Sequence, residues 1–161
     1  MSPHTYQAKA EMPRPLSIKQ LSVTYNGSIL HGRVVEMDGI SHFLIDVWLD
    51  KQDFPLVMEQ IADQLDQPAI GIISYRKLSE GDYEMQPFVY VKTTGSQGFE
   101  RSCGSGSLAL GSSLADLDKG NSFALRQPGG VVQVDIGDTY SISTTVKFTI
   151  DGLLGGNPRF F

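Results

Sequence analysis

The sequence is poor in cysteine and in positive charge. It contains one cysteine among 161 residues, which excludes an internal disulfide framework and a multi-cysteine zinc site. Its 13 Lys and Arg residues are outnumbered by 18 Asp and Glu residues, and the formal net charge is −5. A nucleic-acid groove needs clustered positive charge to release counterions from phosphates, so we expect no nucleic-acid partner.

Long apolar runs are also missing. No segment reaches the roughly 20 apolar residues of a membrane-spanning helix, and the polar start lacks the apolar run of about 7–15 residues of a secretory signal. We therefore expect a cytoplasmic protein with no membrane partner. Residues 1–15, which include three prolines, are predicted to form a flexible N-terminal tail.

The rest of the chain has the composition of one globular domain. Hydrophobic residues make up 40% of the sequence, charged residues make up 19%, and 17 glycines supply turns. A length of 161 residues fits a single domain, which we place at residues 16–161.

Strand-forming patterns occupy most of this domain. Asn26-Gly27 lies between two runs rich in apolar and β-branched residues and predicts a hairpin, because both central residues of a type I′ turn need positive φ. A second turn at Asp38-Gly39 leads into a third strand. The predicted strands cover residues 16–25, 29–37, 40–49, 69–78, 84–94, 122–125, 131–136 and 140–150.

Two helices are predicted between these strands. The first starts at Asp53, which can cap it, and carries apolar residues at every fourth position from Val57. The second follows Cys103 in the sequence CGSGSLALGSSLADLDKG, where apolar and very small residues lie on all sides. Such a helix is usually buried. The predicted class is α+β: a curved, largely antiparallel sheet wrapped around a central helix, plus a second helix.

One segment carries candidate chemistry, the Gly- and Ser-rich start of the second predicted helix. The first N–H groups of a helix lack internal acceptors and carry the positive end of its dipole. Gly104 and Gly106 have no side chains to keep a carboxylate away from those groups. The same field favours the thiolate of Cys103. One helical turn could therefore hold a carboxylate and present a base that removes the Cα proton of an amino acid.

Cys103 also has a purely structural interpretation. Cysteines outside disulfides are commonly buried as small hydrophobic residues, and the sequence Cys-Gly-Ser-Gly is weakly specific. The position of Cys103, between a strand and a small-residue helix, favours the functional interpretation.

Residues 100–110 (ERSCGSGSLAL) resemble the second-lobe cysteine motif of the cofactor-independent amino-acid racemases and epimerases. This superfamily includes diaminopimelate epimerase, proline racemase and the histidine racemases. The resemblance extends through most of residues 28–150. Residues 38–43 (DGISHF) lie where diaminopimelate epimerases carry Gly-Asn-Pro-His, and residues 85–92 (MQPFVYVK) and the PGG turn at 128–130 also fall in the expected places.

The resemblance implies a diaminopimelate epimerase-like lobe and a two-base mechanism. Two lobes hold an amino-acid substrate between them, and one thiolate takes the α-proton while the opposed thiol returns a proton to the other face. No pyridoxal phosphate and no metal are implied. Cys103 would be the acid/base group, His42 the motif histidine that helps the thiol chemistry, and the backbone of Gly104, Ser105 and Gly106 the carboxylate site.

Several positions depart from the motifs of the best-known members. Diaminopimelate epimerases carry Glu-Arg where this chain has Thr94-Gly95, and asparagine where it has Ile40, which makes diaminopimelate an unsuitable substrate. Proline racemases place proline where Ser102 stands. The pattern therefore favours the histidine-racemase-like members and the uncharacterised ones. Glu100 could tune the Cys103 thiol, bind a substrate ammonium group, or be a surface carboxylate.

We expect an isomerase domain, corresponding to the second, C-terminal lobe only. The chain offers one cysteine, and three arrangements follow. It is a fragment of a two-lobed protein, or a complementary first-lobe chain or a second copy in a homodimer supplies the opposed base, and the isolated lobe could be inactive. The alternative is a non-catalytic carboxylate-binding or interaction domain of the same fold. A sister fold that isomerises with carboxylates is less favoured because the cysteine stands in the expected place.

Overall fold

Ten strands and two α-helices make up residues 5–147, the part of the chain that the computed structural model describes. Two single-turn 3₁₀ helices, Lys51–Asp53 and Ala62–Gln64, flank the first α-helix. The α-helices are α1 (Phe54–Ile61) and α2 (Gly104–Asp116). The strands are β1 (Thr5–Met12), β2 (Ser17–Tyr25), β3 (Ser28–Met37), β4 (Ile40–Ile45), β5 (Ala69–Ser79), β6 (Asp82–Val91), β7 (Ser96–Phe99), β8 (Ser122–Gln127), β9 (Gly130–Ile136) and β10 (Tyr140–Lys147).

All ten strands belong to one mixed sheet with the order β1-β10-β9-β8-β6-β5-β4-β3-β2, and β7 pairs with β6 outside this path. Among the described strands, β4 with β5 and β6 with β8 are parallel, and the other pairs are antiparallel. Parallel neighbours need a long crossover, and α1 and α2 lie in these two crossovers. The α+β class expected from the sequence is confirmed.

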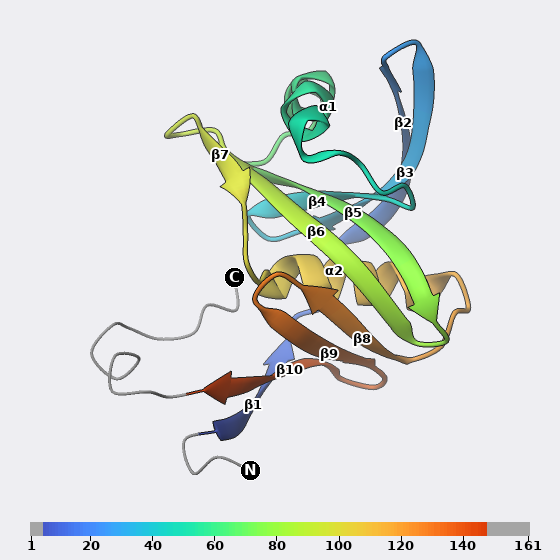
Figure 1. Cartoon of the computed structure of the whole chain (residues 1–161), viewed down its shortest axis with the longest axis vertical. Coiled ribbons are helices and arrows are strands. Elements are labelled where there is room, and N and C mark those ends of the chain that lie inside the picture. Colours follow the sequence, from blue (N-terminus) through green and yellow to red (C-terminus); the bar gives the residue numbers. More distant parts are fainter. Residues whose placement is uncertain (1–4, 148–161) are drawn as a thin grey trace.

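Helix α2 packs against strands from both halves of the sheet, namely β3, β4 and β5 and also β8, β9 and β10 (Figure 1). Every residue from Gly104 to Leu114 is buried, as the composition of this segment predicts. Gly111 shows why small residues are needed, because a Cβ atom there would lie 2.5 Å from Cγ1 of Val134 on β9. The close approach of helix and sheet depends on that glycine.

Strand β4 is buried on both faces because the two helices cover opposite sides of it. Phe43 and Ile45 belong to the apolar cluster that contains α1, whereas Leu44 belongs to the cluster that contains α2. The alternation of side chains along a strand therefore places His42 on the face of β4 toward α2.

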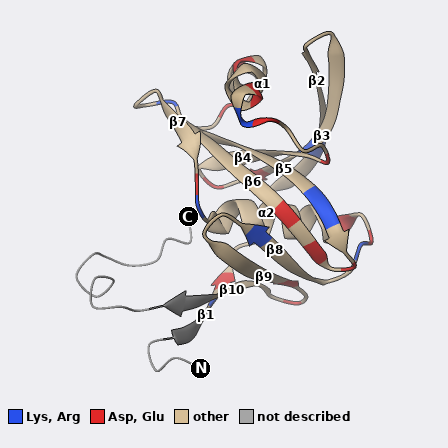
Figure 2. Cartoon of the chain, viewed as in Figure 1, with Lys and Arg blue, Asp and Glu red and all other residues tan. Residues whose placement is uncertain are grey.

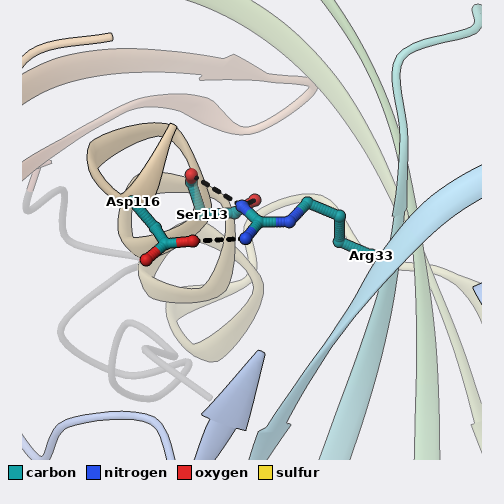
Figure 3. A network of polar contacts seen from close by, with 3 residues as sticks. All are labelled: Arg33, Ser113 and Asp116. Atoms are coloured by element: carbon teal, nitrogen blue, oxygen red, sulfur yellow. Dashed lines mark hydrogen bonds and ion pairs between the residues drawn. The ribbon is translucent and has the colours of Figure 1, made fainter. Parts of the chain in front are cut away.

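Arg33 of β3 anchors the C-terminal part of α2 to the sheet (Figure 3). Its Nη1 donates to the carbonyl oxygen of Ser113 at 3.0 Å and to the hydroxyl of the same residue at 2.8 Å, and Nη2 pairs with Asp116. A cation at this end of a helix also complements the helix dipole.

Charges of opposite sign pair across the outer surface of β5, β6 and β8 (Figure 2). Arg76 Nε donates to Glu84 at 2.8 Å, and Arg126 Nε donates to Asp82 at 2.9 Å. The second pair crosses from β6 to β8, where only three residue pairs form the parallel ladder. Exposed pairs of this kind contribute little to stability, because water and salt screen them.

The prediction of a flexible tail over residues 1–15 is wrong for residues 5–12, which form β1 and pair with β10. Ala8 and Ala10 are partly buried and Met12 is buried, whereas Lys9 and Glu11 are exposed. This alternation is that of a strand with one covered face.

Other boundaries also differ from the expected ones. Strand β7 forms where glycines predicted a break, because its residues pair antiparallel with the end of β6. Strand β4 ends at Ile45 rather than at residue 49. Asp53 is the N-cap residue of α1, but its side chain makes no capping hydrogen bond. Residues 148–150 of the last predicted strand lie outside the described residues.

The hairpin predicted at Asn26-Gly27 is confirmed, with φ values of 48° and 72° at its two central residues. No helix among residues 5–147 is long and apolar enough to cross a membrane.

Candidate functional site

The candidate site is the N-terminal end of α2, where Cys103 is the N-cap residue. Cys103 has an extended backbone (φ −128°, ψ 110°), and its Sγ accepts a hydrogen bond from the N–H of Gly106 at 3.3 Å. This sulfur occupies the position at which a serine or aspartate oxygen ordinarily caps a helix. The cap N–H and the positive end of the helix dipole both favour negative charge on the sulfur. Cys103 is 3% exposed.

Ser105 connects Cys103 to the sheet. Its Oγ lies 3.7 Å from Cys103 Sγ and 3.0 Å from Nε2 of His42 on β4. The structure thus brings together three of the residues predicted from the sequence, in the order His42, Ser105, Cys103. The sequence assigned only the backbone of Ser105 to the site, whereas its hydroxyl is the group that links the other two.

His42 is completely buried, and burial lowers its pKa to about 4. The imidazole is therefore neutral at pH 7. Its environment depends on Gly71, the residue paired with His42 on β5, because a Cβ atom at Gly71 would lie 2.1 Å from His42 Nδ1. Only glycine leaves room for the ring.

The hydrogen-bond pattern favours one tautomer of His42. Within residues 5–147, Nδ1 is buried and has no hydrogen-bond partner. An orphaned N–H donor in the interior is rarer than an orphaned acceptor, so the proton belongs on Nε2. Nε2–H then donates to Ser105 Oγ, and the Ser105 hydroxyl hydrogen is available to the Cys103 sulfur.

Gly106 allows the close packing of this end of α2. A Cβ atom there would lie 2.9 Å from Cδ1 of Ile73 and 3.1 Å from Cys103 Sγ. Gly104, Ser105 and Gly106 are all buried, and the N–H of Gly106 donates to the thiol. A carboxylate site on this backbone therefore stays a prediction.

Glu100 lies in the segment between β7 and Cys103 and is partly buried. Its backbone N–H donates to the carbonyl oxygen of Pro87 at 2.9 Å. The carbonyl oxygen of the next residue, Arg101, accepts a hydrogen bond from the N–H of Gly129 at 2.7 Å. The predicted PGG turn therefore holds the segment that leads into α2. The hydrogen bonds from Cys103 to His42 run through Ser105, and a catalytic role for Glu100 remains a prediction.

Sequence reasoning missed Gln127, the last residue of β8. Its Oε1 accepts the backbone N–H of Cys103 at 2.8 Å. The two residues are far apart in the sequence, and the only local signal is that Gln127 directly precedes the PGG turn. Among the described residues, no three His, Cys, Asp or Glu side chains are grouped as a metal site would need.

The fold is similar to that of a crystal structure named as a phenazine biosynthesis PhzC/PhzF protein, from Clostridium difficile (strain 630). The TM-score is 0.52 at 16% sequence identity, and the match covers 92% of this chain and 57% of that chain. The class defined by the fold is therefore a PhzF-like, diaminopimelate epimerase-like α+β fold.

Residues 2–154 match the family described as "Histidine racemase CntK N-terminal domain", and the chain belongs to this family. Two curated relatives are histidine racemases of Fusobacterium nucleatum subsp. nucleatum. The chain is 28% identical to that of strain ATCC 25586 over 149 residues and 30% identical to that of strain ATCC 23726 over 152 residues. Each match covers 91% of this chain and 55% of the relative, so the chain spans about half the length of these relatives.

The family confirms the resemblance to the cofactor-independent racemases and corrects one part of it. The matching family is that of an N-terminal domain, which contradicts the expected assignment to the second, C-terminal lobe. Because the two lobes of this superfamily are expected to share one fold, a cysteine motif at the start of the central helix does not by itself separate them.

Proposed function

We propose that this chain is the first lobe of a cofactor-independent amino-acid racemase that acts on histidine, with Cys103 as one of two opposed acid/base groups. The observation that carries the proposal is the position of the thiol. Cys103 caps α2, accepts the N–H of Gly106, and lies 3.7 Å from a serine hydroxyl that is itself held by a buried histidine. The family and both relatives support histidine as the substrate.

In this mechanism the Cys103 thiolate removes the α-proton from one face of the amino acid. The Gly106 N–H and the Ser105 hydroxyl lower the free energy of the thiolate by hydrogen bonding. Neutral His42 fixes the orientation of Ser105 and adds no charge of its own. The substrate carboxylate would take N–H groups at the start of α2, and Glu100 could bind the substrate ammonium group.

The second base must come from outside this sequence, because the chain has a single cysteine. A complementary second lobe is the first candidate, since the chain spans 55% of its relatives. A second copy related by a two-fold axis is the other, because it would place two Cys103 thiols across one pocket. Either arrangement predicts little or no racemisation by a single isolated chain.

The test is exchange of the histidine α-proton for deuterium, followed by NMR in heavy water. We expect exchange by the chain together with its complementary lobe, or by the chain at concentrations where sedimentation shows a dimer. Cys103→Ser should reduce the exchange rate by at least about a hundredfold, the scale of a general acid–base contribution. Ser96→Ala, an exposed serine on β7, is the matched control and should leave it unchanged.

A panel of other amino acids defines the substrate in the same assay. Exchange with another amino acid but not with histidine would contradict the proposed substrate. Exchange that persists in Cys103→Ser would contradict the proposed base.

The near-complete burial of Cys103 favours a second candidate, a non-catalytic domain that binds small carboxylates. This candidate predicts that histidine perturbs the amide resonances of residues 104–106 without any α-proton exchange. It also predicts that Cys103→Ser retains the binding, because the backbone N–H groups would be its ligands.

A further inference from the structure

We propose that Gln127 is a positioning residue for Cys103, holding the backbone of the thiol-bearing residue through contacts separate from those of His42. This inference rests on the proposed function of Cys103. Gln127 ends β8 and is 8% exposed. Its Oε1 accepts the Cys103 N–H at 2.8 Å, and its Nε2 donates to the hydroxyl of Ser107 at 2.7 Å.

Ser107 closes these contacts into a ring. Its hydroxyl donates to the carbonyl oxygen of Cys103 at 2.6 Å, and its backbone N–H donates to the same oxygen at 2.9 Å. Both polar backbone groups of Cys103 are therefore held by one continuous set of hydrogen bonds. Ser107 is completely buried, so water does not compete for these partners.

The direction of the ring is fixed by chemistry. A backbone N–H can only donate, so the atom of Gln127 facing Cys103 must be the carbonyl oxygen. The Ser107 hydroxyl gives its single hydrogen to Cys103, so it must accept from the Gln127 amide. The carboxamide offers an acceptor and a donor on one flat group, whereas an ionised carboxylate or an apolar side chain would lose at least one bond.

The ring and His42 hold the site from two distant parts of the sheet. Gln127 on β8 fixes the backbone of Cys103, whereas His42 on β4 fixes Ser105, whose hydroxyl reaches the sulfur. The distance of 3.3 Å between Sγ and the Gly106 N–H depends on the backbone angles of Cys103. Loosening the ring should weaken that hydrogen bond and make the thiolate less stable.

The single cysteine allows a direct test by ultraviolet absorbance of the thiolate. The six tyrosines also absorb when ionised, so the signal of Cys103 is the difference between each titration and that of the same chain carrying Cys103→Ser. Gln127→Glu keeps the acceptor, removes the donor and adds a negative charge. We expect it to raise the pKa of the Cys103 thiol by about one unit or more, a tenfold loss of thiolate at a given pH. Ser107→Ala opens the ring without adding charge and should raise that pKa by a smaller amount.

Gln133→Glu is the matched control, because it makes the same change of charge on the neighbouring strand β9, away from the ring. It should leave the thiol pKa unchanged. Circular dichroism and thermal unfolding identify the variants that fold. If Gln127→Glu does not fold, Ser107→Ala alone tests the proposal. Folded Gln127→Glu and Ser107→Ala variants with the pKa of the parent chain would overturn the proposal.

Thiol titration needs no turnover, so it separates this proposal from the proposed function. A raised pKa in a chain that exchanges no amino acid, either with its complementary lobe or as a dimer, would leave the positioning role intact and reject the racemase. Where exchange is measurable, Gln127→Met should lower kcat with little change in KM, because the residue acts on the base and not on the bound substrate.

Discussion

At the residue scale, the burial of His42 makes folding depend on pH. Burial lowers its pKa to about 4, whereas an unfolded histidine has a pKa of about 6.5. Between these values the unfolded chain binds a proton that the folded chain does not bind. The free energy of unfolding should therefore fall by about 3 kcal/mol as the pH is lowered from about 6.5 to about 4.

Urea denaturation at several pH values measures this effect. Because carboxylates also titrate in this pH range, the quantity compared between variants is the slope of the free energy of unfolding against pH. His42→Gln should remove the part due to His42, while His31→Asn, at an exposed histidine on β3, should keep it. Equal pH dependence in His42→Gln and the parent chain would show that His42 is not the buried neutral group.

The residues of the site differ in how far the sequence could predict them. Cys103, Gly104, Ser105 and Gly106 are consecutive, and the chemistry of a helix start follows from local sequence alone. Gln127 reaches Cys103 only through the order of strands, which no local pattern encodes. His42 was found through its motif, but its partner Ser105 could be assigned only once β4 and α2 were placed together.

At the element scale, the fit of α2 against β9 reverses an ordinary substitution effect. Replacing glycine by alanine inside a helix usually stabilises it by about 0.5–1 kcal/mol. At Gly111 the added methyl group would meet Val134 Cγ1 at 2.5 Å. Gly111→Ala should instead lower the free energy of unfolding by about 1–3 kcal/mol.

A double-mutant cycle with Val134→Ala tests this cause. The second substitution removes Cγ1, the atom nearest to the new methyl group, and keeps Cβ at 3.0 Å, so the double variant should be less destabilised than the sum of the single variants. Additive effects would mean that the strain lies elsewhere in the helix.

The predicted elements agree with the structure where the local sequence pattern alone specifies the element. Helix α2 was recognisable because its own residues are apolar or very small on all sides, and β2 and β3 were recognisable because of their turn. Strands β1 and β7 were missed because each forms only through pairing with a strand that must already be in place.

At the scale of the whole molecule, β1 completes the sheet and covers the edge of β10. Removing residues 1–12 would expose the N–H and C=O groups of β10 and delete Met12, which is 6% exposed in the core. We expect a loss of at least about 2–5 kcal/mol, the cost of a large-to-small change at one buried methionine, and a tendency to associate through the new edge.

Chemical denaturation and sedimentation measure these two effects. Leu16→Ser, at a residue that is 65% exposed just before β2, is a control that should change neither. A truncated chain that is as stable and as monomeric as the parent would contradict a structural role for residues 1–12 and support the flexible tail predicted from the sequence.

The order of the sheet also has a consequence for biosynthesis. The first two strands of the chain end up on opposite edges, and Met12 finds its partner only at Tyr140. At about 5–20 residues per second, the ribosome needs on the order of ten seconds to make the intervening chain. During that time β1 has no native partner, and the charges of Lys9 and Glu11 are well placed to keep the nascent strand from pairing with another copy.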